Sequence, residues 1–380
     1  MTREELDRRA FLSALGRYAG GACVTCGIGG LFPGQVRAQA APATSREVDF
    51  YERLPDGRIQ CGVCPHRCTL ADGESGFCRA RTNVAGRHIN RGYNKPCILS
   101  VDPIEKLPLN HFRPATKTLT IAVGGCNLRC LYCQNWQHSQ TPPDEQETFD
   151  LTPADAVASA RKKGLDTIAF SYTEPVAFLE YAKDTAAAAH RSGLKVVVAT
   201  AAHVNPAPLL AFAEHVDAFT ITLKGFDEEF YRRMCGISLA PVLTSIETIK
   251  HKTKCWLELV NLVVPTYNDD PRRIGEMARW IREHLGADVP LHFARFVPMY
   301  RLANLPRTPV PTLEAACDAA REAGLRYVYT SNIAPHEGTN TFCPRCGEVL
   351  IERLGFKILD SKLRRGACPK CRQKLPGVWS

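Results

Sequence analysis

The chain has 380 residues, enough for one large domain with small attachments or for two domains. With 45% hydrophobic and 23% charged residues, its composition is that of an ordinary folded protein and excludes wholesale disorder. A formal net charge of +9 suits acidic partners such as an electron-donating protein or a nucleic acid, although a solvated basic surface explains it more simply. No stretch is long and apolar enough for an ordinary membrane span.

Cysteine is the unusual component, with 17 residues. Most fall into three groups whose neighbours are separated by two or three residues, a spacing that suits metals better than disulfides. Disulfide-rich proteins are typically short secreted chains, so we interpret these cysteines as reduced and metal-bound. Four others stand alone and are interpreted as ordinary thiols: Cys97, Cys235, Cys255 and Cys317.

Residues 1–45 are predicted to be a leader. Arg8 and Arg9 resemble the pair of a twin-arginine export signal, and residues 38–40 fit a small-residue cleavage site. This pattern indicates a periplasmic or membrane-associated protein. Arg17 interrupts the apolar run, however, so an uncleaved amphipathic leader on a cytoplasmic protein is the alternative.

Residues 46–115 are predicted to form an N-terminal cysteine-rich module. Its four cysteines, at Cx2Cx3Cx9C spacing, could close around one metal: Cys61, Cys64, Cys68 and Cys78. The spacing departs from a standard zinc ribbon, so zinc and an iron–sulfur cluster both stay open, with a structural role favoured. Further on, Asn110 and His111 either line the functional site or serve structurally.

The next cysteine group follows an apolar run at 118–123 and the turn residues Gly124 and Gly125. It places three thiols within eight residues, at Cx3Cx2C spacing: Cys126, Cys130 and Cys133. Such a loop can wrap one small inorganic cluster, and a four-iron cluster normally takes four thiolates. Three would leave one iron open to a small molecule. The alternatives are a structural zinc loop and an oxidised surface loop.

This loop, with Tyr132 before its last cysteine, resembles the radical SAM signature residue for residue. The resemblance implies that the open iron is chelated by the amino and carboxylate groups of S-adenosylmethionine. An electron from the cluster would then break a C–S bond and yield a 5′-deoxyadenosyl radical. It implies a catalytic role for the three cysteines and a place for Tyr132 in the cofactor site.

Residues 116–335 alternate between two patterns. Strand-like runs fall at 118–123, 167–172, 194–199, 218–223, 257–264, 291–297 and 326–330. Helix-like runs fall at 152–163, 175–191, 206–214, 227–235, 241–251, 271–285 and 312–323. Nearly continuous apolar strands indicate a parallel sheet covered on both faces. The α/β alternation therefore predicts a full or partial TIM-like (β/α) barrel, with its active site at the carboxyl ends of the strands.

Polar residues follow three of these strands. Glu174, Thr200 and Lys224 stand at or just after successive strand ends. In a radical SAM enzyme, Glu174 could accept from the ammonium of S-adenosylmethionine and Lys224 could donate to its carboxylate, with Thr200 between them. His203 is interpreted as a core or second-layer residue.

Residues 336–380 are predicted to be a separate C-terminal module. Two CxxC pairs are spaced for one four-thiolate metal site, in a zinc ribbon or a rubredoxin-like module with one iron: Cys343, Cys346, Cys368 and Cys371. The tail is basic, which either favours nucleic acid or keeps a small module soluble.

From Cys61 to Trp379 the chain resembles the radical SAM enzymes of the AmmeMemoRadiSam system, relatives of pyruvate formate-lyase activating enzyme. Besides the cysteine groups, the matching segments are residues 102–106, 133–136, 171–175, 290–293 and 336–341. The family implies a [4Fe-4S] cluster on the Cys126 loop and S-adenosylmethionine as co-substrate. Two departures lie where that co-substrate should bind: Ala201-Ala202 in place of an Asn-Gly turn, and Thr222 in place of Asp.

We therefore predict a radical SAM enzyme that removes hydrogen from an unidentified small-molecule or protein substrate, for example a protein glycine. A flavodoxin or ferredoxin would supply electrons. The alternatives are an electron carrier with several iron–sulfur centres and an RNA-modifying radical SAM enzyme, although nucleic acid is the less expected partner. The sequence leaves open the substrate, the metals of the two outer modules and the fate of S-adenosylmethionine.

Overall fold

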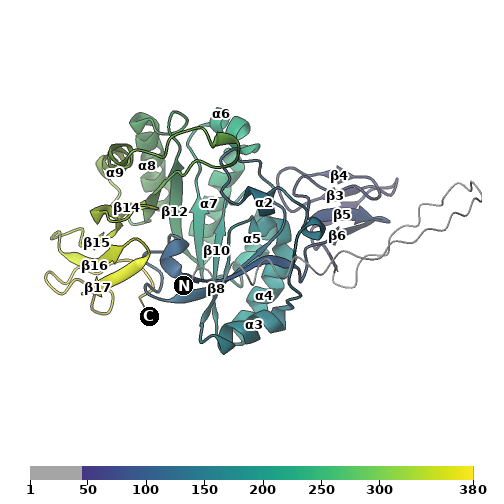
Figure 1. The fold of residues 1–380 in the computed structure, drawn as a ribbon, viewed down its shortest axis with the longest axis horizontal. Coiled ribbons are helices and arrows are strands. Elements are labelled where there is room, and N and C mark those ends of the chain that lie inside the picture. The colour runs from purple at the N-terminus through teal and green to yellow at the C-terminus, as the bar shows by residue number, and fades with distance from the viewer. Residues whose placement is uncertain (1–44, 380) are drawn as a thin grey trace, which may run out of the picture. The chain divides into compact units, whose positions relative to one another are not determined.

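A computed structural model describes residues 45–379, and an eight-stranded sheet is its frame (Figure 1). The strand order is β14-β13-β12-β11-β10-β9-β8-β7. In chain order the strands are β7 (Pro96–Pro103), β8 (Lys117–Val123), β9 (Thr167–Phe170), β10 (Lys195–Thr200), β11 (Ala218–Thr222), β12 (Trp256–Val263), β13 (Leu291–Arg295) and β14 (Val328–Ser331). Neighbours from β8 to β14 are parallel, and the edge strands β14 and β7 do not pair with each other. The predicted α/β barrel is therefore confirmed, in its partial form.

Helices connect the parallel strands where the sequence predicts them. They are α3 (Pro153–Lys162), α4 (Leu179–Arg191), α5 (Pro206–Ala213), α6 (Glu228–Phe230), α7 (Ala240–Lys252), α8 (Pro271–Leu285) and α9 (Val310–Glu322). Shorter turns are η2 (Ile104–Lys106), α2 (Trp136–Ser139), η3 (Pro143–Glu145), η4 (Pro175–Phe178), η5 (Tyr231–Cys235), η6 (Tyr300–Leu302) and η7 (Glu337–Thr339). At α3, Thr152 and Asp155 form a reciprocal capping box, which satisfies backbone donors at the helix start.

Strand β7 is the one barrel strand that the sequence does not predict. It pairs antiparallel with β8, from Pro96 opposite Val123 to Pro103 opposite Lys117. Proline at both of its ends lowers its strand signal, but a proline is tolerated on an edge strand because one side of that strand needs no donors. The sheet therefore continues across residue 116, where the sequence predicts the start of the barrel.

Two small sheets form the N-terminal module. One has the order β1-β6-β5 and the other β2-β3-β4. Their strands are β1 (Arg46–Glu47), β2 (Tyr51–Arg53), β3 (Ile59–Cys61), β4 (Thr69–Leu70), β5 (Arg81–Val84) and β6 (Arg87–Asn90). A buried ion pair joins the module to the barrel, because Arg81 Nη2 lies 3.0 Å from Glu180 Oε2 on α4. The Asn90 side chain donates to the same carboxylate at 2.6 Å.

The C-terminal module is a third antiparallel sheet, drawn in yellow beyond β14 in Figure 1. Its strands are β15 (Thr341–Phe342), β16 (Val349–Leu354) and β17 (Lys357–Ser361). His111 is fully buried where this tail meets the barrel, with its ring nitrogens 2.6 Å from Tyr329 Oη and 2.7 Å from the Pro376 carbonyl oxygen. Of the two interpretations of His111, the structure supports the structural one.

Among residues 45–379, no helix is both long enough and apolar enough to span a bilayer. The predicted leader lies almost entirely outside the described residues, so the twin-arginine signal stays a prediction.

Candidate functional site

Two glycines turn the chain from β8 into the cysteine loop. Gly125 has a φ of +91°, and a Cβ atom there would lie 2.5 Å from the Cys78 carbonyl oxygen. Any other residue would meet both a strained backbone and a backbone clash. The close approach allows the Cys126 N–H to donate to that same carbonyl at 3.1 Å.

The loop is held by backbone hydrogen bonds to the η5 turn. The Arg129 N–H donates to the Cys235 carbonyl at 2.7 Å, and the Leu131 N–H donates to the Met234 carbonyl at 2.9 Å. Peptide groups therefore fix the loop independently of the cysteine side chains. A loop positioned in this way presents its three thiols in a defined arrangement.

A cavity of about 400 Å³ lies against this loop. The residues predicted from the sequence that line it are Cys126, Cys130, Tyr132, Cys133, Glu174, Thr200 and Lys224. They come from the ends of β8, β9, β10 and β11, which are neighbours in the parallel sheet. The barrel thus brings all these residues to one cavity at the carboxyl ends of its strands, as expected for the fold.

Glu174 is buried and held by three donors. Its carboxylate accepts from the Thr200 hydroxyl at 2.5 Å, from the Ala201 N–H at 2.9 Å and from the Val176 N–H at 3.4 Å. Burial raises the pKa of Glu174, and these donors oppose the rise. A cation entering the cavity would stabilise its charged form.

Lys224 supplies positive charge opposite the cysteines. Its Nζ lies 5.8 Å from the centroid of the Tyr132 ring. Burial lowers the pKa of Lys224, but the nearby sulfurs of Cys130 and Cys235 outweigh burial, so the net shift is upward. The ammonium therefore stays charged and is available to an anionic ligand or to a thiolate-bound centre.

Cys235 is a site residue that the sequence did not reveal. A hydrogen bond to Cys235 raises the pKa of Cys130 well above its usual range, and burial adds a smaller rise. The Cys235 Sγ also lies 3.4 Å from Tyr132 Oη. It does not line the cavity, so three sulfurs face the open space while this fourth thiol supports them from behind. Cys235 is a buried core thiol, as predicted, but its contact with the loop could not be predicted because nothing local in the sequence links the two.

Other contacts complete the walls of the cavity. The Ser139 hydroxyl lies 3.3 Å from Cys133 Sγ. Lys106, which follows β7, lines the cavity and donates to Asp102 and to the Tyr172 hydroxyl, each at 2.8 Å. Residues 102–106, which the sequence connects to the site only through a family resemblance, therefore have a local role at the cavity.

The two positions that depart from the resembled pattern, Ala201-Ala202 and Thr222, lie at or beside this cavity. Ala202 adopts a φ of +55°, a left-handed conformation that glycine reaches at lower cost, and its N–H donates to the Thr200 hydroxyl at 2.8 Å. Thr222 lines the cavity. His203 does not line it and lies behind the loop, where its carbonyl accepts from the Asn127 side chain at 2.7 Å.

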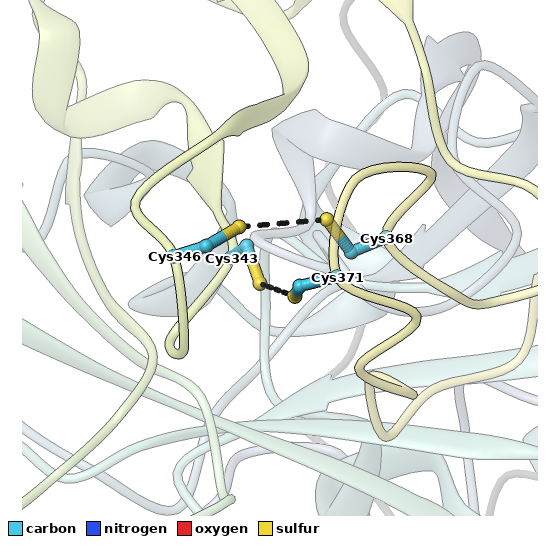
Figure 2. Close-up of side chains that lie close together, drawn as sticks. All are labelled: Cys343, Cys346, Cys368 and Cys371. Atoms are coloured by element: carbon cyan, nitrogen blue, oxygen red, sulfur yellow. Dashed lines mark hydrogen bonds between the residues drawn. The ribbon is translucent and has the colours of Figure 1, made fainter.

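The C-terminal cysteines form a compact metal site (Figure 2). The sulfurs of Cys343, Cys346, Cys368 and Cys371 all lie within 4.8 Å of one another. The Cys343–Cys371 distance is 3.4 Å and the Cys346–Cys368 distance is 3.7 Å. Four thiolates around one tetrahedral ion, with metal–sulfur bonds of about 2.3 Å, stand roughly 3.8 Å apart. The geometry fits a single metal ion and leaves its identity open.

The N-terminal cysteines lie in one module but are spread more widely. Within residues 45–379, the C-terminal set is the group in which three or more His, Cys, Asp or Glu ligand atoms come within 4.8 Å of one another. Cys61, Cys64, Cys68 and Cys78 do not meet that distance. The compact single-ion geometry is therefore absent from the described N-terminal module.

The donor set around the Cys126 loop fits an iron–sulfur cluster with one open iron. Three sulfurs border a cavity large enough for a ligand, and an anionic and a cationic side chain face the same space. An amino acid carries an ammonium and a carboxylate, so its two charges match Glu174 and Lys224.

Comparisons with known proteins agree with this chemistry. A family model described as the Radical SAM superfamily matches residues 120–281, which include the whole cysteine loop. An uncharacterized protein of Methanocaldococcus jannaschii, MJ0808, is 43% identical over 332 residues, covering 87% of this chain and 98% of that protein.

Solved structures are less similar. A domain of pyruvate-formate lyase-activating enzyme from Bacteroides vulgatus matches 43% of this chain and 98% of its own, at 14% identity and a TM-score of 0.37. A radical SAM methyltransferase from Sphaerobacter thermophilus matches 58% of this chain and 68% of its own, at 15% identity and a TM-score of 0.45. Likeness at this level says nothing about substrate or reaction. The family match across the cysteine loop and the relative that aligns over nearly its whole length place this chain in the radical SAM superfamily.

Proposed function

We propose that this protein is a radical SAM enzyme of the AmmeMemoRadiSam type, related to activating enzymes, which abstracts hydrogen from a substrate. Superfamily membership implies a [4Fe-4S] cluster and S-adenosylmethionine, and it requires a reductant. One observation carries the proposal: three loop cysteines, Glu174 and Lys224, from separate strand ends, line one cavity. When bound, the cluster and S-adenosylmethionine would supply a 5′-deoxyadenosyl radical.

The three loop cysteines, Glu174 and Lys224 each have a proposed role. Cys126, Cys130 and Cys133 hold the cluster through their thiolates. Glu174, oriented by the Thr200 hydroxyl and the Ala201 N–H, accepts from the ammonium of S-adenosylmethionine. Lys224 donates to the carboxylate, and its charge also offsets the thiolates around the cluster.

The substrate would enter through a second cavity of about 450 Å³. Four residues line both cavities: Gln134, Ser331, Asn332 and Phe356. The added wall is largely apolar but includes three ionisable side chains, Glu105, His292 and Arg353. A substrate bound there would present a C–H bond at the boundary between the two cavities. The substrate could be a protein partner that the enzyme activates by removing hydrogen. The walls would limit water around the reacting groups.

Two further assignments accompany the proposal. The compact C-terminal site is proposed to hold structural zinc, because a closed four-thiolate set is typical of zinc ribbons. A flavodoxin or ferredoxin is the proposed electron donor.

The test is anaerobic reconstitution of the protein with iron and sulfide, followed by dithionite and S-adenosylmethionine. We expect release of 5′-deoxyadenosine and a change in the EPR signal of the reduced cluster on adding S-adenosylmethionine. Cys130→Ala should abolish both effects. Cys255→Ala is the matched control and should retain both effects. The Cys255 thiol donates to the carbonyls of Ala213 and Val216 and does not line the cavity. An intact reduced cluster that neither responds to S-adenosylmethionine nor cleaves it would overturn the proposal.

A further inference from the structure

The proposed function leaves the four cysteines of the N-terminal module without a role. Three of them are buried, Cys61, Cys64 and Cys78, with 7–8% of their surfaces exposed. The Cys61 N–H donates to the Cys68 carbonyl at 2.9 Å, and Cys61 and Cys64 pack in the same core. A Cβ atom on Gly76 would lie 3.7 Å from Cys68 Sγ, so the turn that leads to Cys78 packs against Cys68. These four thiols therefore share one largely buried site, although their sulfurs are not gathered within 4.8 Å.

The spread distinguishes this set from the C-terminal one. In the same chain, the C-terminal sulfurs already stand at the separation that one tetrahedral ion requires. The N-terminal thiols would have to contract to hold a single ion. A four-iron, four-sulfide cage is larger than an ion and takes one thiolate at each iron, so its ligands stand further apart.

The surroundings of the set suit an anionic centre. Arg81 is 2% exposed; its Nη2 pairs with Glu180, and its Nη1 lies 4.0 Å from Cys78 Sγ. Its Nε is buried and has no hydrogen-bond partner among the described residues. The Phe77 N–H donates to Cys68 Sγ at 3.4 Å. A buried cation and N–H donors aimed at sulfur stabilise a thiolate-bound cluster and influence its potential.

The set also lies directly behind the radical SAM loop. Besides the hydrogen bond from the Cys126 N–H to the Cys78 carbonyl, the His66 ring donates to the Asn127 carbonyl at 2.9 Å. Cysteines of both sets also belong to one continuous core. One peptide-to-peptide contact therefore separates a ligand of one set from a ligand of the other.

We propose that Cys61, Cys64, Cys68 and Cys78 hold a second [4Fe-4S] cluster that exchanges electrons with the centre at the Cys126 loop. Four thiolates close it to small molecules, so its chemistry is electron transfer alone. The exchange is balanced: the N-terminal cluster goes from the 1+ to the 2+ state while its acceptor goes from 2+ to 1+. An external one-electron reductant then returns the N-terminal cluster to the 1+ state, and no bond is made or broken. The electron-transfer role rests on the proposed function, whereas occupancy of the site does not.

The test compares the anaerobically reconstituted full chain with a triple variant, Cys126→Ala/Cys130→Ala/Cys133→Ala. We expect about eight acid-labile sulfides in the wild type and about four in the variant, because each cubane contributes four. The remaining cluster should give a [4Fe-4S] Mössbauer spectrum, and S-adenosylmethionine should leave its EPR signal unchanged. Iron or zinc at the C-terminal site brings no sulfide and does not disturb this count.

A second variant and a second measurement make the result independent of the folding of any one variant. Cys61→Ala/Cys64→Ala should retain about four sulfides and an EPR signal that responds to S-adenosylmethionine. In fully reduced wild type, two nearby paramagnetic clusters should broaden each other's EPR signals, and the broadening should vanish in either variant. About four sulfides in the wild type, or none in the triple variant, would overturn the inference. A wild type with eight sulfides and no response to S-adenosylmethionine would instead overturn the proposed function.

Discussion

Glu174 shows how neighbouring donors can position a single buried carboxylate for a cationic ligand. Two neutral donors from the next strand end, the Thr200 hydroxyl and the Ala201 N–H, fix its carboxylate without neutralising it. Burial meanwhile disfavours its charge, so a cationic ligand would find a positioned but incompletely compensated acceptor. We therefore expect the affinity for S-adenosylmethionine to depend on this carboxylate and on the hydrogen bonds that position it.

Glu174→Gln should weaken the binding of S-adenosylmethionine to the protein with its cluster intact. A charge-assisted hydrogen bond contributes about 1.5–3 kcal/mol, so we expect roughly a ten- to hundredfold higher Kd. Anaerobic equilibrium dialysis would measure the Kd, and iron content would confirm that the cluster remains. The exposed Glu283→Gln is the control for a lost surface charge. Equal affinities in both variants would remove Glu174 from the cofactor site.

At the scale of elements, the C-terminal sheet contributes to the site as well as to the fold. The turn between β16 and β17 brings Phe356 into the lining of both cavities. The sheet packs through a small core in which Tyr327 and Tyr329 contact Leu350 and the metal-site cysteines. Because the module has so few apolar residues of its own, we expect metal binding to be needed for its stability.

Cys368→Ser/Cys371→Ser should release the C-terminal metal and loosen residues 341–375. We expect rapid hydrogen exchange in this segment by mass spectrometry, while β9, β10 and β11 keep their protection, because the parallel sheet has its own core. Metal analysis would show the loss of one ion per chain. Cys317→Ala on α9 serves as the control for removal of a thiol elsewhere. Unchanged exchange in 341–375 would mean that the metal does not stabilise this module.

Across the whole molecule, Glu258 ties three separate segments together. Its carboxylate accepts from the backbone N–H groups of Asn110 and His111, from Trp256 Nε1 and from His292 Nε2, at 2.8–3.0 Å. These donors lie before β8 and on β12 and β13. Burial raises the pKa of Glu258, but the contact with His292 and the other donors outweighs burial and lowers it overall. Long-range polar contacts thus join the barrel to the segment on which the C-terminal tail docks.

Glu258→Gln should destabilise the protein by about 3–5 kcal/mol, because it removes the charge from a buried network and turns an amide donor toward other donors. The urea midpoint, followed by far-UV circular dichroism under anaerobic conditions, would record the loss. Glu247→Gln is a matched control at an exposed carboxylate that pairs with His284. A shift no larger than that of the control would contradict this account of the network.

Much of the architecture was predictable because its signals are local. Apolar runs and capping residues predict the strands and helices of the barrel, and closely spaced cysteines predict metal sites because ligands near in sequence meet in one loop. The glycine pair before Cys126 was recognised as a turn for the same reason. Strand β7 was missed because its prolines and mixed pattern acquire strand character only beside β8.

The sequence by itself determined the superfamily chemistry, the order of the parallel strands and their helices, and the residue types offered for metals and cofactor. Only the tertiary structure brought Cys235 against Cys130, joined the two cavities at Phe356 and set the N-terminal cysteines directly behind the radical SAM loop. The spacing of cysteines along the chain predicts a metal at both ends, although only the C-terminal spacing matches a zinc ribbon. The distances between their sulfur atoms differ, because the two sets lie in different small modules and are held by contacts between segments far apart in the chain.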